Sequence, residues 1–286
     1  MIMATVISMI NLKGGVGKTT LTVAMAEFMA AEYGLKVLVV DLDPQTNATV
    51  ALINELEWRK RNIRGQTLLN IFLDHLSKYQ VFSLEEAIVH NVSNVNGGIE
   101  GLDLLPSSID LIEVHDEFLQ AIPSLPINPL HLLDDVLRAA LSAYDIVLID
   151  CPPDLGLICQ NGLMISDYYI IPTIPDILST YGIPQIINRI GRLQRENSIS
   201  IQPLGLVISK YRQQSEIHKN QANLLKIHAP KAGYRQVFNT FIPEGNLAAM
   251  VMDYTLHFNS LREKYNYSKY YQIYKALTEE VLSCVQ

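Results

Sequence analysis

The chain contains few of the residues and segments that mark secreted or membrane-spanning proteins. Its three cysteines, Cys151, Cys159 and Cys284, show no paired spacing among 286 residues, which predicts a reducing, cytoplasmic location. The N-terminus, MIMATVISMINLKGG, has no basic segment before its apolar stretch and no small-residue cleavage site. We therefore interpret it as a first strand rather than a signal peptide. The apolar runs are also too short to span a bilayer.

Basic residues are outnumbered as well. The 22 lysines and arginines face 29 aspartates and glutamates, which gives a net charge of −7. This balance disfavours a protein coated in basic charge, but it allows a local basic patch. Hydrophobic residues make up 49% of the chain, ample for a buried core. No repeat, low-complexity tract or linker divides the sequence, so we expect one domain over residues 1–286.

Short β-branched runs alternate with longer stretches of helical patterning, which predicts a doubly wound α/β fold with a mostly parallel sheet and helices on both faces. The predicted strands are Thr5–Asn11, Lys36–Asp41, Leu102–Leu105, Asp145–Asp150, Tyr168–Thr173, Leu204–Ser209 and Gln236–Thr240. The predicted helices are Thr19–Tyr33, Pro129–Ala143, Pro184–Glu196 and Ser260–Ser283. The least readable region is 50–101, which we interpret as helical surface structure that ends in a turn at VNGG.

A glycine-rich loop, NLKGGVGKTT at 11–20, follows the first predicted strand. It ends like a phosphate-binding loop, although Leu12 stands where the general pattern requires glycine. Its glycines allow backbone N–H groups to approach phosphate, and the helix that follows adds partial positive charge. Lys18 can reach the β- and γ-phosphates, and the Thr19 hydroxyl can bind Mg²⁺. An ordinary glycine-rich turn is the alternative, which the strand–loop–helix context disfavours.

KGGVGKTT resembles the deviant Walker A loop of the ParA/MinD family of ATPases, which identifies the fold as a P-loop NTPase of this class. The resemblance implies that Lys13 crosses a nucleotide-sandwich homodimer and touches the phosphates of the other subunit. It also implies ATP and Mg²⁺ as cofactors. The loop residues expected at the nucleotide are Lys13, Gly14, Gly15, Val16, Gly17, Lys18, Thr19 and Thr20.

Two later segments supply carboxylates at the ends of predicted strands. DLDPQTNAT at 41–49 resembles the switch I segment of the family except at Thr46, and this match implies that Asp43 positions the attacking water while Asp41 lies near the Mg²⁺ shell. A turn or capping role for Asp43 is the alternative. YDIVLIDCPPDLG at 144–156 resembles the Walker B segment with switch II, so Asp150 would hold a Mg²⁺-bound water. The expected catalytic residues are Lys13, Lys18 and Asp43, and the expected metal site comprises Thr19, Asp43 and Asp150.

The family holds adenine with the loops after two late strands. The matching places here are Ser209-Lys210 and Ile242-Pro243-Glu244, so Ser209, Ile242 and Pro243 are the expected adenine contacts. Family members often carry Asn or Asp where Ser209 stands, and the sequence departs from the pattern at this point. The resemblance also includes LLPSS at 104–108 and IPEGNLAAM at 242–250, whereas the 50–101 segment is atypical.

The segment from 189 to 235 contains nine basic residues and two acidic ones, although the whole chain is acidic. Such asymmetry indicates a polyanion surface, and small members of the family bind DNA nonspecifically through basic residues in this part. The chain should then be associated with the nucleoid. A solvated charged face is the alternative. The expected DNA contacts are Arg189, Arg192, Arg212, Lys219 and Lys226.

Other members of the family fit less well. The C-terminus, ALTEEVLSCVQ, lacks the basic amphipathic helix that a MinD-like protein uses on membranes, so membrane binding is the weaker interpretation. The tyrosines just before this C-terminal segment should pack the predicted C-terminal helix onto the body of the protein or form a surface for a partner. Cys151 and Cys159 lie too close together to match the iron–sulfur cysteines of the nitrogenase iron protein, and buried, inert thiols are favoured.

The sequence therefore predicts a slow Mg²⁺-dependent ATPase of the small ParA type. ATP would drive dimerisation and DNA binding, and a ParB-like or cargo-adaptor partner would stimulate hydrolysis to position plasmid, chromosome or protein cargo. The alternatives are a MinD-like membrane-associated positioning ATPase and a metabolic enzyme of the same loop class, such as an amidoligase or a reductase component.

Overall fold

A computed structural model describes residues 4–76, 81–114, 117, 128–246, 250–266 and 269–285. Its centre is a six-stranded sheet with the order β3-β2-β4-β1-β5-β6, in which all neighbouring strands run parallel. The strands are β1 (Thr5–Met9), β2 (Val37–Asp41), β3 (Leu102–Leu105), β4 (Ile146–Asp150), β5 (Tyr168–Thr173) and β6 (Gln202–Ile208). The predicted doubly wound fold is thereby confirmed.

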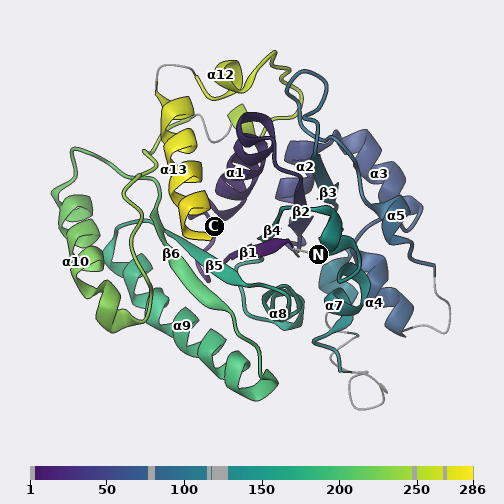
Figure 1. Ribbon diagram of the computed structural model, residues 1–286, viewed down its shortest axis with the longest axis horizontal. Coiled ribbons are helices and arrows are strands. Elements are labelled where there is room, and N and C mark those ends of the chain that lie inside the picture. The colour runs from purple at the N-terminus through teal and green to yellow at the C-terminus, as the bar shows by residue number, and fades with distance from the viewer. Residues whose placement is uncertain are drawn as a thin grey trace.

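Helices cover both faces of this sheet (Figure 1). On one face lie α1 (Lys18–Tyr33), α2 (Asn47–Leu52), α12 (Leu261–Lys264) and α13 (Tyr270–Val285). On the other lie α4 (Leu69–Leu76), α7 (Leu132–Leu137), α8 (Leu157–Met164), α9 (Ile177–Asn197) and α10 (Glu216–Ala232). The short helices α3 (Glu55–Ile63) and α5 (Leu84–Ala87) lie beside the β3 edge. No helix of the described chain is long and apolar enough to cross a bilayer.

The register of the central strands brings three loops together. Met9 of β1 and Asp41 of β2 both pair with Asp150 of β4, so these strands end at the same level. The glycine-rich loop follows β1 directly, and the predicted switch segments follow β2 and β4. Because ligands of open α/β sheets bind beyond the carboxyl ends of the strands, this register positions the site.

Aromatic packing holds the C-terminal helix against α1. Phe28 of α1 contacts Tyr265, Tyr271 and Tyr274 with ring centroids 5.1, 5.2 and 6.4 Å apart. All four side chains are buried. The tyrosines therefore pack the helix onto the body, as one of the two sequence interpretations proposed.

The predicted strand Gln236–Thr240 is wrong. The segment runs beside β6 but joins it at a single isolated bridge between Leu206 and Val237, with the Leu206 amide donating to Gln236 O and the Phe238 amide donating to Leu206 O, both at 2.9 Å. The next two amides, of Asn239 and Thr240, donate to the Glu280 carboxylate of α13 at 2.7 and 2.8 Å. A tertiary contact thus takes the hydrogen bonds that would have extended the sheet.

Several predicted helices also have wrong bounds, and α8 and α10 were not predicted. Helix α9 begins seven residues before Pro184, because Asp176 caps it by accepting from the Ser179 amide at 2.6 Å. The stretch Pro129–Ala143 divides into α7 and a 3₁₀ turn at Ala140–Ala143. Ser260–Ser283 divides into α12 and α13, since Asn266 adopts a left-handed conformation with φ 49°. Residues 267–268 of this stretch lie outside the described chain. Residues 247–249 of the IPEGNLAAM motif also lie outside it.

The 50–101 segment is helical, as predicted, but it is not only surface structure. Ile71 and Phe72 of α4 are buried in the core on one face, and Leu52 is buried on the other. Val89 then forms an antiparallel bridge with Leu104 of β3. The segment therefore covers the edge of the sheet that β3 would otherwise expose.

Candidate nucleotide-binding site

The glycine-rich loop connects β1 to α1 with the geometry of an anion cradle. Gly15 and Gly17 have φ angles of 72° and 91°, which side-chain-bearing residues rarely adopt. Gly17 caps α1 without any side-chain hydrogen bond, so the first amides of this 16-residue helix remain available to a ligand. Gly14 and Gly15 are exposed and Val16 is buried, which fixes the loop while leaving its rim open.

Lys18 is held in place by a residue that sequence reasoning missed. Its side chain is buried, and Nζ donates to the Asn11 carbonyl at 3.2 Å. The Asn11 side chain in turn donates to Pro172 O at 2.7 Å and accepts from the Lys13 amide at 2.9 Å. Asn11 therefore ties both ends of the loop to β5. The only sequence signal was a polar residue at the end of an apolar strand.

Lys13 extends away from its own loop toward the start of α9. Its Nζ lies 2.8 Å from Ser179 Oγ and 3.2 Å from Asp176 Oδ2. Burial alone would raise the pKa of Asp176, but hydrogen bonds from Ser179 and Lys13 lower it below its ordinary value. Lys13 is therefore exposed and held by a surface ion pair in the single chain.

Asp150 has an unsatisfied oxygen. The side chain is fully buried, and Oδ1 accepts from the Thr22 hydroxyl at 3.3 Å, whereas Oδ2 has no partner. Burial raises the pKa of Asp150 to about 7. The nearby Thr19 hydroxyl acts to lower the pKa of this carboxylate. A buried, uncompensated carboxylate beside the Thr19 hydroxyl fits a hydrated divalent cation, which would favour its ionised form.

The two switch I carboxylates have different surroundings. Asp41 is fully buried, with Oδ2 accepting from the Thr49 amide and hydroxyl at 2.8 and 2.7 Å and Oδ1 accepting from the Asp43 amide at 3.1 Å. It shapes the loop and has little capacity left for other ligands. Burial raises the pKa of Asp43, whose Oδ1 accepts from the Gln45 amide at 2.9 Å. In the described chain no three carboxylate, histidine or cysteine side chains form a metal cage.

A cleft of about 570 Å³ lies beside the loop and contains all three predicted adenine contacts. It is lined by Gly17, Thr20, Leu21, Ser209, Lys210, Ile242, Pro243, Glu244, Gly245, Asn246, Tyr270 and Tyr274. Ser209 Oγ donates to Val16 O at 2.6 Å, so this side chain braces the loop. Tyr270 and Tyr274 were not predicted to line this cleft. The only sequence signal for them was the tyrosine-rich C-terminal stretch.

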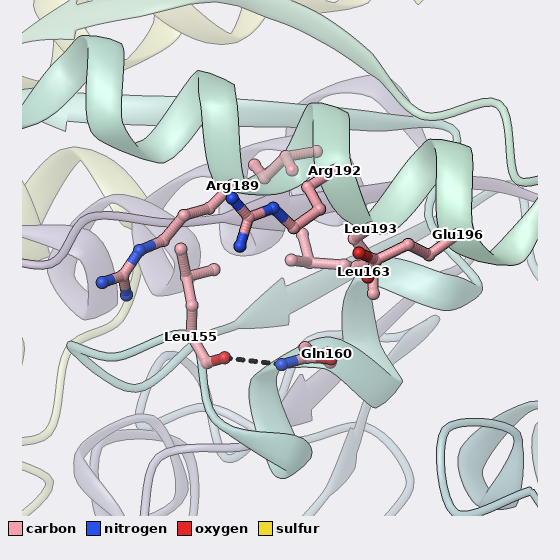
Figure 2. Close-up of a pocket in the computed structure, with 8 residues that line it drawn as sticks. Leu155, Gln160, Leu163, Arg189, Arg192, Leu193 and Glu196 are labelled. Atoms are coloured by element: carbon pink, nitrogen blue, oxygen red, sulfur yellow. Dashed lines mark hydrogen bonds between the residues drawn. The ribbon is translucent and has the colours of Figure 1, made fainter.

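The five predicted DNA residues have two kinds of surroundings. Arg189 and Arg192 lie on α9, where they line a pocket against α8 (Figure 2). The other three lie on α10 or just before it and have partners: Arg212 with Glu244, Lys219 with Glu216, and Lys226 over the Phe241 ring.

The two cysteines near the site are inert. Cys151 follows Asp150 and Cys159 lies in α8, and both are fully buried. Their mutual hydrogen bond and burial raise the pKa of the Cys159 thiol well above its ordinary value. Neither thiol is therefore placed to hold a cluster at the surface.

Comparisons with known proteins agree with this geometry. Residues 4–202 match a family model described as an AAA domain. The sporulation initiation inhibitor protein Soj of Bacillus subtilis is 30% identical over 72% of this chain and 73% of its own.

Two solved structures have similar folds. Cobyrinic acid a,c-diamide synthase from Mycobacterium smegmatis, solved with an ATP analogue and magnesium, has a TM-score of 0.75 and 23% identity over 99% of this chain and 96% of its own. A Cyanothece McdA–ATP complex has a TM-score of 0.76 and 19% identity, also over 99% of this chain and 96% of its own. The loop, the switch carboxylates and the Soj relationship together show that the chain belongs to the ParA/MinD family of ATPases.

Proposed function

We propose that the chain is a Mg²⁺-dependent ATPase of the small ParA type, which dimerises around ATP, binds DNA nonspecifically and positions a cargo. The observation that carries this proposal is the juxtaposition of the loop, the unsatisfied oxygen of Asp150 and the 570 Å³ cleft. These features suit the phosphates, the metal and the base of one nucleotide, respectively. The chromosome-partitioning ATPase Soj of Treponema pallidum, which is 26% identical over 82% of this chain, supports the same function.

The loop would bind the phosphates through its amides and the α1 N-terminus, while Lys18 neutralises the β- and γ-oxygens. Mg²⁺ would supply charge stabilisation on the transferred phosphoryl group. Thr19 and Asp150 would hold the ion, Thr19 directly and Asp150 through a bound water. Asp43, partly desolvated at the edge of this site, would orient the attacking water.

Lys13 would act in the second subunit. Its lateral position and its exposure leave it free to exchange the Asp176 contact for the phosphates of a partner copy. An exposed ion pair is worth no more than about 1 kcal/mol, so this exchange costs little. ATP binding would thereby be coupled to dimerisation.

DNA binding would use the basic surface of α10 and the loop before it. Arg212 and Lys219 are paired with exposed carboxylates, and such surface pairs yield readily to phosphate. Lys226 is the third contact. This surface neutralises a sugar–phosphate backbone without reading bases, so binding should weaken steeply with salt. A ParB-like or cargo-adaptor partner would stimulate hydrolysis and release the DNA at the nucleoid.

The decisive experiment is co-sedimentation with DNA at low and high salt, with ATP, with ADP and without nucleotide. ATP-dependent binding that is lost as salt rises supports the proposal. Binding of the ATP form to liposomes but not to DNA would overturn it in favour of a MinD-like role. Lys18→Ala should abolish nucleotide binding, whereas Asp43→Ala should retain ATP and trap the dimer.

A further inference from the structure

A second concave site lies beside Leu155, at the end of the switch II loop. It is a pocket of about 280 Å³ between α8 and α9, here named the α8–α9 pocket. Its lining residues are Leu155, Gln160, Leu163, Arg189, Ile190, Arg192, Leu193 and Glu196. The nucleotide chemistry described above uses none of them.

The floor of the α8–α9 pocket is aliphatic. Leu163 of α8 and Ile190 of α9 are buried beneath it, and Leu193 follows Ile190 one turn later on the same face. Leu155, at the end of the switch II loop, extends from the opposite side in Figure 2. A floor of this size accommodates one branched aliphatic side chain. None of the described residues that line the pocket is aromatic, so they offer no platform on which a nucleic-acid base could stack.

Two unpaired arginines stand at the rim. Arg189 and Arg192 are exposed and have no ion pair with any residue of the described chain, unlike Arg61, Arg138 and Arg212. They lie three residues apart on α9, and Figure 2 shows both reaching over Leu155 while Glu196 occupies the other end. Guanidinium groups of this kind bind carboxylates in a bidentate manner.

We propose that the α8–α9 pocket binds an acidic segment of a partner protein, in which an aliphatic side chain fills the floor and a neighbouring carboxylate pairs with Arg189 and Arg192. The combination of an apolar floor with unpaired cations at one end matches this chemistry better than a sugar–phosphate backbone, which has no aliphatic side chain to bury. These two arginines are thereby separated in function from the α10 surface proposed for DNA.

The pocket is connected to the hydrolytic site through one short loop. The Leu155 carbonyl accepts from Gln160 Nε2 at 2.8 Å, and the Gly156 carbonyl accepts from the Gln160 amide at 2.9 Å. This loop begins at Asp150, the expected metal-site residue. A ligand that holds Leu155 therefore restrains the loop that follows Asp150. The identification of this ligand with the partner that stimulates hydrolysis rests on the proposed function. Binding of an acidic segment at the pocket does not rest on it.

The test uses the full chain without nucleotide, so its outcome is independent of ATPase activity. The probes are two blocked tripeptides, glutamyl-leucyl-glutamate and lysyl-leucyl-lysine, titrated while the methyl NMR signals of Leu155, Leu163 and Leu193 are followed. The acidic peptide should shift these signals and bind at least about tenfold more tightly than the basic one. The double variant Arg189→Glu/Arg192→Glu should reverse the preference, and Arg195→Glu on the same helix should leave it unchanged.

Three results would overturn the proposal. The first is an acidic peptide that leaves the three methyl signals unshifted in a chain whose circular dichroism is native. A loss of acidic-peptide binding in Arg195→Glu equal to that in the double variant would indicate a general charge effect. A duplex oligonucleotide that shifts the same signals, when the acidic peptide does not, would return both arginines to the DNA surface.

Discussion

Removing one member of the buried ion pair beneath α1 should destabilise the fold strongly. Lys264 Nζ donates to Glu27 Oε1 and to Asn94 Oδ1, both at 2.7 Å, and neither charged side chain has any solvent exposure. The Glu27 carboxylate also accepts from Tyr265 and Ser93 at 2.6 and 2.5 Å. This network fastens α1, the helix that begins at the phosphate loop, to α12 and to the loop at 93–94.

Lys264→Met keeps most of the side-chain volume but removes the only cation that forms an ion pair with Glu27 in the described chain. An uncompensated buried charge costs about 3–5 kcal/mol in the free energy of unfolding. Glu27→Leu should cost a similar amount, because it leaves Lys264 buried without its counter-ion. The double variant should lose less than the sum of the two, since no lone charge remains, although the Tyr265 and Ser93 hydroxyls lose an acceptor.

Urea unfolding followed by circular dichroism measures these values, with Lys60→Met on the exposed surface of α3 as the matched control, expected within about 0.5 kcal/mol of the parent. A loss below about 1 kcal/mol for Lys264→Met, or single-variant losses that simply add, would refute the account of a coupled buried pair.

Three further substitutions test other contacts. Gly98→Ala should lower the unfolding free energy by about 1–3 kcal/mol, because φ is 135° and a Cβ would lie 2.2 Å from Asn91 O; thermal unfolding equal to the parent would contradict this. Gly245→Ala should weaken binding of a fluorescent ATP analogue without loss of stability, since its Cβ would displace the Tyr270 hydroxyl; unchanged affinity would remove Tyr270 from the cleft wall. Asp176→Asn should release Lys13 and lower the ATP concentration needed for dimerisation by up to about fivefold, as measured by sedimentation velocity; a higher requirement would show that Asp176 acts within the dimer.

The strands and the loop could be read from the sequence because their signals are local. Apolar β-branched runs that end in Asp41 or Asp150 specify buried parallel strands, and glycines at 15 and 17 specify a backbone that only glycine adopts readily. Gln236–Thr240 shows the limit of such reasoning. Its composition suits a strand, but Glu280, some forty residues away in the chain, takes its amides.

The sequence alone therefore determined the family, the strand–loop–helix arrangement around the glycine-rich loop, and the types of residue available to bind phosphate and metal. Only the tertiary structure decided which of those residues meet. It placed Ser209, Ile242 and Pro243 in one cleft, left one oxygen of Asp150 without a partner, and turned Lys13 toward Asp176. It also placed Arg189 and Arg192 at the rim of the α8–α9 pocket. The physical reason is that pairing and burial depend on contacts between distant segments, which no local pattern of residues encodes.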